Sequence, residues 1–417
     1  MLLYIDPGTG SMLFTIVLGA VTTLYFLARR FIVYIKFRVS GGKIEKADSE
    51  KIPYVIFSDG KQYWNVFAPI CDEFEKRKTR LEYWTASEED PGLKRDYKYV
   101  NCRYIGSGNK AFTRLNIMNA SLCLATTPGL DVLQWKRSKD VDWYVHILHA
   151  AGTSAAGYRM FSLDYYDAVL LTGEFQIDEI RELEKKRNLP AKELKVVGCT
   201  YMDELKKRLD TEGRDVHNGL TVLLAPSWGS SSILVRYGSH IIDALLDIGY
   251  NLIIRPHPQS FTADKEVMDD LIKKYPDSDR LTWNRDTDNF SALNRADIMI
   301  SDFSSVIFDY CLIFNKPFIY TENTFNKAQY DAAWLDEEMW KFRVLPSIGL
   351  PLKEEDFPNM KEIIQNAVKD EGLSRGRDQA RAESWANIGQ SAVLTVDYMM
   401  KKYDHICRTQ EKEIKHR

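Results

Sequence analysis

The longest apolar stretch in the chain lies near its start. No charged residue occurs from Pro7 to Ala28, and most positions from Met12 to Leu27 are apolar. About 20 apolar residues span the core of a bilayer as a helix. Basic residues follow at once, beginning with Arg29 and Arg30, and positive charges mark the cytoplasmic end of a membrane helix. The pattern predicts one N-terminal transmembrane helix, in a single-pass protein of the cell membrane whose remaining domains are cytoplasmic.

Two other interpretations of this stretch exist. A cleaved signal peptide has a basic start and a small-residue cleavage site after the apolar run. Here Asp6 precedes the run and two arginines follow it, which favours an uncleaved anchor. The third interpretation is a buried helix of a soluble domain, and the length and the charged flank favour the membrane helix over it.

Short apolar runs rich in branched residues follow a polar linker at residues 39–52, each bounded by turn residues or a charged amphipathic stretch. Continuous apolar strands of this kind belong to parallel sheets that are covered on both faces. The predicted strands form two sets, which are Tyr54–Phe57, Leu122–Ala125, Tyr144–Leu148, Ala168–Leu171 and Leu194–Val197, and then Leu220–Ala225, Asn251–Ile254, Ala296–Ile300 and Pro317–Tyr320.

A polar stretch from Thr211 to Asn218 separates the two sets. We therefore predict an α/β fold with two Rossmann-like domains that face a cleft, with ligands at the carboxyl ends of the strands. The segment Asp378–Lys402 predicts one or two closing helices. The expected limits are an anchor and linker at residues 1–50, α/β domains at 51–215 and 216–390, and a C-terminal helix with a basic tail at 391–417.

Composition narrows the class of protein further. The chain has 417 residues and a net charge of -3, which gives no reason to expect nucleic-acid binding. Its 6 cysteines include no Cys-x-x-Cys pair, so they are interpreted as free thiols in a reducing compartment. No Walker loop, dinucleotide fingerprint or nucleophile elbow occurs, and no histidine and acidic residues have metal-ligand spacing. We expect neither a metal nor a cofactor.

His149 is the first candidate for chemistry, because it directly follows the predicted strand Tyr144–Leu148. Small residues come after it and allow a ligand to approach closely. Histidine is the side chain best suited to remove a proton from an alcohol near neutral pH. A histidine that only caps the strand is the alternative. His146, inside the strand, is expected to be a packing residue.

Arg255 and His257 form the second candidate site, in the sequence Arg-Pro-His-Pro after the strand Asn251–Ile254. The two prolines fix the backbone, so His257 is held stiffly. An arginine beside a histidine suits an anionic group such as a phosphate. The alternative is a rigid loop with an incidental surface histidine.

The third candidate site begins at Ser301, where another predicted strand ends. Ser304 resembles the N-cap of a helix that runs to about Phe314, and the first turn of such a helix binds phosphate through free N–H groups. Asp309, four residues after Ser305, would accept hydrogen bonds from a ribose or a polyol. Pure helix capping is the alternative. A weaker candidate for lining the phosphate site is the Ala-Pro-Ser-Trp stretch around Ser227. A flexible loop is the alternative.

Together, these segments resemble the CDP-glycerol glycerophosphotransferase family, whose known members build teichoic acids and related polymers. The stretches Ala225–Trp228, Arg255–Pro258 and Ser301–Tyr310 occur in the family's order. The resemblance extends from Ile52 to about Tyr320. It departs from the family at Leu148–Gly152, where the better-known polymerases have Trp-His-Gly-Thr-Pro.

The resemblance implies a glycosyltransferase-B architecture and roles for particular residues. His149 matches the general base, and His257 matches the histidine that contacts the donor's phosphates. The residues expected to bind the donor phosphates and nucleotide are Arg255, Ser304, Ser305, Asp302, Asp309 and Ser227. The implied reaction moves glycerol phosphate from CDP-glycerol, or a related CDP-polyol, to a hydroxyl of a lipid-linked or polymer acceptor at the membrane, and releases CMP.

Other functions are compatible with the same residues. A sugar nucleotide or CDP-ribitol would use the same phosphate site, because only the pocket for the transferred group differs. A membrane-tethered scaffold that kept a nucleotide-binding fold is the non-enzymatic alternative, and the presence of both His149 and His257 argues against it. The oligomeric state cannot be predicted from these patterns.

Overall fold

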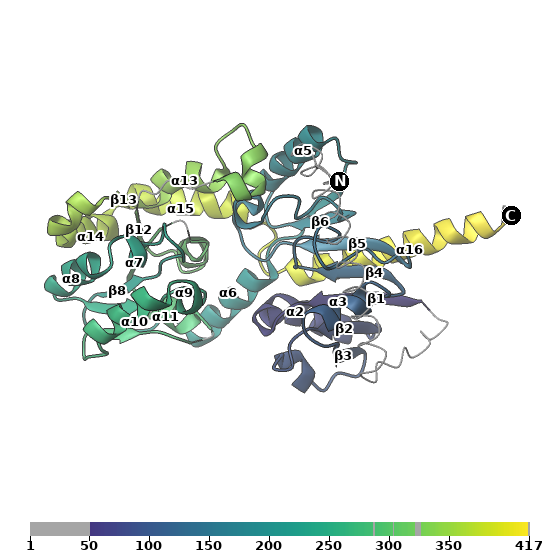
Figure 1. Cartoon of the computed structure of the whole chain (residues 1–417), viewed down its shortest axis with the longest axis horizontal. Coiled ribbons are helices and arrows are strands. Elements are labelled where there is room, and N and C mark those ends of the chain that lie inside the picture. Colours follow the sequence, from purple (N-terminus) through teal and green to yellow (C-terminus); the bar gives the residue numbers. More distant parts are fainter. Residues whose placement is uncertain (1–50, 287, 303, 322–326, 416–417) are drawn as a thin grey trace, which may run out of the picture. The chain divides into compact units, whose positions relative to one another are not determined.

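Two parallel β-sheets organise the protein (Figure 1). A computed structural model describes residues 51–286, 288–302, 304–321 and 327–415. By their contacts, residues Ile52–Arg417 form one unit. The predicted membrane helix and most of the predicted linker lie outside the described residues. Within the described ranges, no helix combines the length and apolarity needed to cross a membrane.

The first sheet of the described chain has seven strands in the order β3-β2-β1-β4-β5-β6-β7, and all of its neighbouring strands run parallel. The order reverses between β1 and β4. In sheets of this kind, ligands bind at the carboxyl ends of the strands where the order reverses. The strands are β1 Ile52–Ser58, β2 Leu81–Thr85, β3 Val100–Tyr104, β4 Ala120–Ala125, β5 Val141–Ile147, β6 Ala168–Leu171 and β7 Glu193–Val196.

The second sheet of the described chain has six strands in the order β10-β9-β8-β11-β12-β13, again all parallel. Its order reverses between β8 and β11, so each sheet has one such switch point. The strands are β8 Thr221–Leu224, β9 Asn251–Ile254, β10 Leu281–Trp283, β11 Ile298–Ser301, β12 Phe318–Thr321 and β13 Leu350–Leu352.

Helices cover both faces of each sheet, and the strands are therefore buried on both sides. Helix α5 shows how the sequence ends these helices. The residue after its last turn, Asn188, adopts a left-handed conformation (φ 52°), which is common at the C-terminus of a helix. The helices of the described residues are α2 Trp64–Lys76, α3 Asn109–Leu115, α4 Ser154–Gly157, α5 Phe175–Arg187, α6 Thr200–Glu212, α7 Ile233–Arg236, α8 Ser239–Asp247, α9 Ser260–Ala263, α10 Lys265–Lys274, α11 Phe290–Arg295, α12 Val306–Phe308, α13 Trp340–Ile348, α14 Met360–Lys369, α15 Glu371–Ser384 and α16 Ser391–Lys415.

The last helix, α16, packs on the first sheet although it follows the second sheet in sequence (Figure 1, yellow). Val396 and Met399 are fully buried in the core beneath that sheet. The Tyr403 ring lies 5.0 Å from the ring of Tyr54 in β1, and Trp143 of β5 donates to the Tyr398 hydroxyl at 3.2 Å. The predicted closing helices are therefore present as α15 and α16.

The α/β fold with two parallel Rossmann-like sheets confirms the predicted fold class. All nine predicted strands are present, and β6 and β9 have the predicted bounds. Four strands were not predicted, namely β2, β3, β10 and β13. The expected domain limits stay a prediction, although the polar stretch Thr211–Asn218 lies in the connection that leads from one sheet to the other.

Candidate functional site

His149 is the second residue after β5 and is only partly buried. Its Nδ1 lies 2.6 Å from the hydroxyl oxygen of Thr126, the first residue after β4. That hydroxyl donates its single hydrogen to the carbonyl oxygen of Ile147 at 2.9 Å, so it accepts a hydrogen bond from His149. Nδ1 therefore carries the ring proton, and Nε2 keeps a lone pair with which to take a proton.

Aromatic rings surround the His149 imidazole. The Tyr63 ring meets it edge-on at 5.1 Å between centroids, and the Tyr158 ring lies at 6.5 Å. Burial lowers the pKa of His149 to about 4, so the ring is neutral at pH 7. His146 is fully buried in the strand and faces the Tyr158 hydroxyl at 3.1 Å, as expected of a packing residue.

Asp59 and Thr127 also lie at this edge of the first sheet, and the sequence patterns had not singled them out. Asp59 is the first residue after β1, and Thr127 is the second residue after β4. Asp59 Oδ1 and Thr127 Oγ1 are buried, and neither makes a hydrogen bond of regular geometry in the part of the chain that the structure describes. The rule that identified His149, a polar residue directly after an apolar strand, also applies to Asp59 and Thr126.

The carboxylate of Asp302 organises the corresponding edge of the second sheet. It is buried and accepts hydrogen bonds from the backbone N–H groups of Ser227 (2.9 Å and 3.0 Å), Ser304 (3.1 Å) and Ile233 (3.3 Å). Burial raises the pKa of Asp302, and these bonds oppose that change. The structure thus brings three of the predicted donor-binding residues together, with Asp302 bonded to backbone groups.

The helix predicted from Ser304 to about Phe314 is present in an altered form. Helix α12 is a single turn with Ser305 as its N-cap residue, and no side chain caps it. The chain continues as a π-helical turn from Asp309 to Ile313. Ser305 is exposed, whereas Asp309 is buried, and burial raises the pKa of Asp309 to about 7. Ser305 and Asp309 therefore lie in different environments, although helical spacing would put them on one face.

Arg255 and His257 follow β9, next to the switch point of the second sheet. The backbone N–H of Gln259 donates to His257 Nδ1 at 3.1 Å, and the Trp228 ring lies 6.2 Å from the imidazole. Burial, and next the charge of Arg255, lower the pKa of His257. The Arg255 guanidinium donates to the side chain of Asn284. This arrangement holds His257 beside the Ser227 loop and directs the Arg255 side chain to Asn284.

The loops at the two sheet edges meet in one place. A Cβ atom at Gly152 would lie 3.9 Å from the ring of Phe308 in α12. Three residues after His149, the first sheet therefore contacts the turn that begins at Ser305. Within the described residues, no hydrogen bond or ring contact joins His149 to His257.

A segment from the second half also reaches the first half, and we call residues 327–341 the crossing segment. Tyr330 forms an antiparallel bridge with Arg159, and the N–H of Lys341 donates to the Thr153 hydroxyl at 3.3 Å. That hydroxyl donates to Glu179 at 3.0 Å, and burial raises the pKa of Glu179 to about 7. The crossing segment braces the chain that follows His149.

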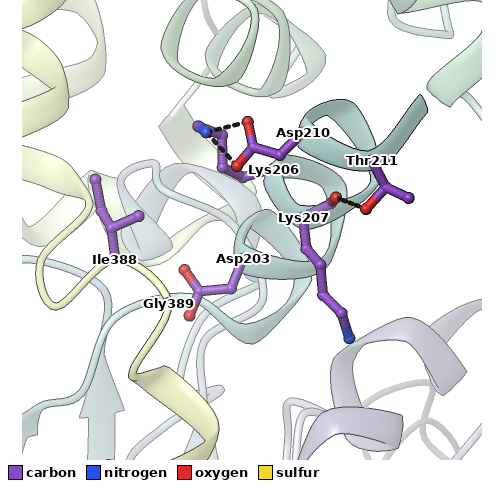
Figure 2. A pocket seen from close by; sticks show the side chains of 7 residues that line it. All are labelled: Asp203, Lys206, Lys207, Asp210, Thr211, Ile388 and Gly389. Carbon is purple, nitrogen blue, oxygen red and sulfur yellow. Dashed lines mark hydrogen bonds and ion pairs between the residues drawn. The ribbon is translucent and has the colours of Figure 1, made fainter. Parts of the chain in front are cut away.

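A surface cavity of about 330 Å³ lies elsewhere, beside α6 (Figure 2). Its lining includes the ion-paired side chains Lys206 and Asp210 and, across from them, Ile388. None of the predicted site residues lines it. Within the described ranges, no group of three or more histidine, cysteine or acidic side chains is placed to hold a metal ion.

Comparisons with known proteins bear on the family and on the fold. Residues 194–333 match the model of the CDP-glycerol:poly(glycerophosphate) glycerophosphotransferase family. This match includes Ser227, Arg255, His257 and Ser304, while His149 lies before it. No curated protein matches the sequence.

Solved structures resemble the chain at low identity. A variant of the wall teichoic acid polymerase TagF soaked with CDPG is 13% identical with a TM-score of 0.56, and the match covers 91% of this chain and 98% of that one. A putative UDP-N-acetylglucosamine 2-epimerase of Listeria monocytogenes is 11% identical with a TM-score of 0.54, over 83% and 95%. The S. aureus MnaA–UDP structure is 13% identical with a TM-score of 0.54, over 85% and 97%.

At these identities the solved structures support the fold alone, which is a pair of Rossmann-like domains. The evidence for a family is the match over residues 194–333, which include the second switch point with Ser227, Asp302 and Ser304. Over this part the chain is similar to the CDP-glycerol glycerophosphotransferases, and the match supports a glycerophosphotransferase-like enzyme.

Proposed function

We propose that the protein transfers glycerol phosphate from CDP-glycerol to a hydroxyl of a membrane-associated surface polymer and releases CMP. One observation carries this proposal beyond the family match. Thr126 fixes the His149 ring with Nε2 as the proton acceptor, and the loop after His149 contacts the turn that begins at Ser305. A base and a helix start that suits phosphate thus belong to adjoining segments.

The reaction is an in-line displacement at the phosphorus that bears glycerol. His149 Nε2 takes the proton of the acceptor hydroxyl while the acceptor oxygen forms a bond to phosphorus. The bond from phosphorus to the CMP oxygen breaks, and CMP leaves with the electron pair. The start of α12 at Ser305, with His257 and Arg255, stabilises charge on the phosphates, and each positioned donor contributes roughly 10²–10³ in rate.

The low pKa of His149 has a consequence for this reaction. A base works best when its pKa lies near the working pH, and burial holds that of His149 at about 4. The negative charge of a bound diphosphate favours the imidazolium and raises this pKa. We expect the acid limb of the kcat profile, which reports the bound enzyme, to lie at higher pH than the limb of kcat/KM.

The membrane assignment is a second part of the proposal. The uncharged stretch Pro7–Ala28 and the arginines after it support an anchor with the catalytic domains in the cytoplasm. Membrane fractionation of the full chain, with a version that starts at Lys51 as the control, tests it. Equal recovery of both versions in the soluble fraction would contradict the anchor.

The donor is tested with the purified full chain and a panel of CDP-glycerol, CDP-ribitol and UDP-sugars. Release of CMP from CDP-glycerol in the presence of acceptor is the expected result. Faster turnover of CDP-ribitol would change the transferred group, and release of UDP alone would indicate a sugar transferase. If no donor turns over under conditions in which CDP-glycerol binds, the scaffold interpretation holds.

Replacement of the base gives the matching test of mechanism. His149→Ala is expected to lower turnover roughly a hundredfold or more, the low end for a positioned base, while CDP-glycerol still binds. His405→Ala, a change at an exposed histidine of α16, is the control and is expected to leave turnover unchanged. Full activity of the His149 variant would refute its role as base.

A further inference from the structure

Two buried polar atoms at the switch point of the first sheet remain without a function in the reaction described above. Asp59 Oδ1 and Thr127 Oγ1 are inaccessible to solvent, and among the described residues neither makes a hydrogen bond of regular geometry. A buried polar atom without a partner costs roughly 1–3 kcal/mol, so such atoms call for an explanation. Both residues retain some exposure elsewhere, so they lie at the border of the core and not deep inside it.

The strand register places these two residues next to each other. Phe57 of β1 is paired with Ala125 of β4, and Asp59 and Thr127 each lie two positions further along parallel strands. The Thr127 hydroxyl is placed to hydrogen-bond with the Asp59 carboxyl and so opposes the rise in its pKa, which puts the two side chains together. Together they form a polar pair at the point where sheets of this type bind ligands.

The pair lies beside the His149 site. Asp59 is close enough for its charge to raise the pKa values of both Tyr63 and Tyr158, and these are the two tyrosines whose rings contact His149. Strand β4 pairs with β5 on its other side, with Ala125 opposite His146. The polar pair and the base therefore extend from three adjacent strands of one sheet edge.

The chemistry of the pair selects the kind of ligand. A carboxylate repels phosphate groups, because two negative charges in a site of low dielectric constant cost free energy. It accepts hydrogen bonds from hydroxyl groups, and a threonine hydroxyl both donates and accepts. A neutral polyol end, which has hydroxyls on neighbouring carbons, satisfies these requirements, whereas the diphosphate of the donor does not.

We propose that Asp59 and Thr127 bind the acceptor: they hold the hydroxyl next to the one that attacks, so the acceptor substrate ends in a vicinal diol. This inference rests on the proposed function. Asp59 accepts a hydrogen bond from the neighbouring hydroxyl, and the attacking hydroxyl gives its proton to His149 Nε2. No covalent bond to either residue forms, and the positions of both hydroxyls are fixed relative to the base.

The test combines two acceptors with two forms of the full-length enzyme. One acceptor is a glycerol phosphate dimer with a terminal vicinal diol, and the other has 1,3-propanediol at that end, which keeps the attacking hydroxyl and lacks its neighbour. The wild-type enzyme is expected to lose roughly ten- to hundredfold in kcat/KM with the propanediol acceptor, as for a hydrogen bond to a charged group. Asp59→Ala is expected to lose less than about threefold on the same change.

Equal losses in the wild type and in Asp59→Ala would overturn the proposal, because the neighbouring hydroxyl would then have another partner. Thr127→Val should raise KM for the diol acceptor and leave the affinity for CDP-glycerol unchanged. A weaker affinity for CDP-glycerol in either variant would also overturn it, since the pair would then belong to the donor site. Glu88→Ala, at an exposed carboxylate after β2 on the same edge, is the matched control.

Two further measurements keep the test decisive. Burial raises the pKa of Asp59, so its ionised form destabilises the fold, and Asp59→Ala is expected to keep or raise the melting temperature at pH 8. If the wild type turns over no donor, the proposed function fails by itself. Calorimetry of acceptor binding is then the test. A preference of the wild type for the diol acceptor over the propanediol acceptor, lost in Asp59→Ala, supports the subsite. The same relative affinity for the two acceptors in the wild type and in Asp59→Ala refutes it.

Discussion

At the scale of single residues, the site depends on how one imidazole is held. Thr126 supplies a neutral acceptor for His149 Nδ1, where a carboxylate would supply a charged one. The hydroxyl orients the ring and fixes its tautomer, but it adds no negative charge to stabilise an imidazolium. Burial can therefore keep the ring neutral until an anionic substrate arrives.

Replacement of this hydroxyl tests its role. Thr126→Val keeps the side chain's shape and removes the acceptor, so we expect kcat to fall roughly ten- to hundredfold, the range for one lost buried partner. The pKa of His149 is expected to fall further, because the imidazolium loses a hydrogen bond. Nitrogen NMR shifts of the histidine ring should report a mixture of tautomers.

Thr126→Ser is the control for this prediction, because it keeps the hydroxyl, and it is expected to retain most of the activity. A Thr126→Val enzyme with unchanged kcat and an unchanged histidine spectrum would show that the ring is oriented by its aromatic neighbours alone.

At the scale of elements, the crossing segment is the main link that brings the second half to the loop after His149. Asp331 in this segment pairs with Arg187 of α5, and both side chains are almost fully buried. The Arg187 guanidinium also lies over the rings of Phe161 and Trp334, at 4.9 Å and 5.1 Å from their centroids. A buried ion pair, whose arginine lies between two aromatic rings, thus helps to fix the segment.

Removal of this pair should cost much of the stability. Asp331→Ala leaves Arg187 buried with only Asp164 as an ionic partner, and we expect a loss of about 3 kcal/mol in the free energy of unfolding. Asp336→Ala breaks an ion pair of the same segment whose carboxylate is 84% exposed, and it should cost less than about 1 kcal/mol. Denaturant unfolding of both variants measures the difference, and equal losses would contradict this account.

The elements also show which features the sequence patterns could predict. Strand β6 is uniformly apolar and β9 is apolar after Asn251, so their limits are visible in the sequence. Strand β3 lies at a sheet edge and alternates buried and exposed residues, and β13 contains Pro351. Edge strands of this kind carry a weak apolar signal, and they were missed.

The candidate site was predictable only in part for a similar reason. His149, Arg255 and Ser304 each follow a strand with a clear apolar pattern. The partners of these residues come from other strands, and the order of strands in a sheet cannot be read from local patterns. For this reason Thr126, Asp59 and Thr127 were absent from the predicted site, although the first two satisfy the same rule.

At the scale of the whole molecule, the connection between α15 and α16 passes tightly against the first sheet. A Cβ atom at Gly173 would lie 2.3 Å from the carbonyl oxygen of Glu383, and one at Gly198 would lie 2.4 Å from that of Ala386. Only glycine allows the backbones to approach this closely. The two halves are therefore joined by two closely placed connections, through α6 and through residues 385–390.

A substitution at Gly173 tests this joint. Gly173→Ala forces the backbone at Glu383 to move, and we expect it to lower the free energy of unfolding by roughly 1–3 kcal/mol, the usual range for overpacking. Gly157→Ala is the matched control, because a Cβ atom there meets nothing within 4 Å. Thermal unfolding of the two variants provides the comparison, and a Gly173→Ala melting temperature at or above that of the control would refute the tight joint.

The position of α16 has a consequence for how the protein is made. Its side chains Val396 and Met399 complete the core beneath the first sheet, yet the ribosome makes them only after the entire second half. An apolar surface of the first half therefore stays uncovered in the nascent chain while roughly 200 more residues are added at 5–20 residues per second. Such a surface is where chaperones bind and where premature association begins, so early termination before α16 should yield aggregates.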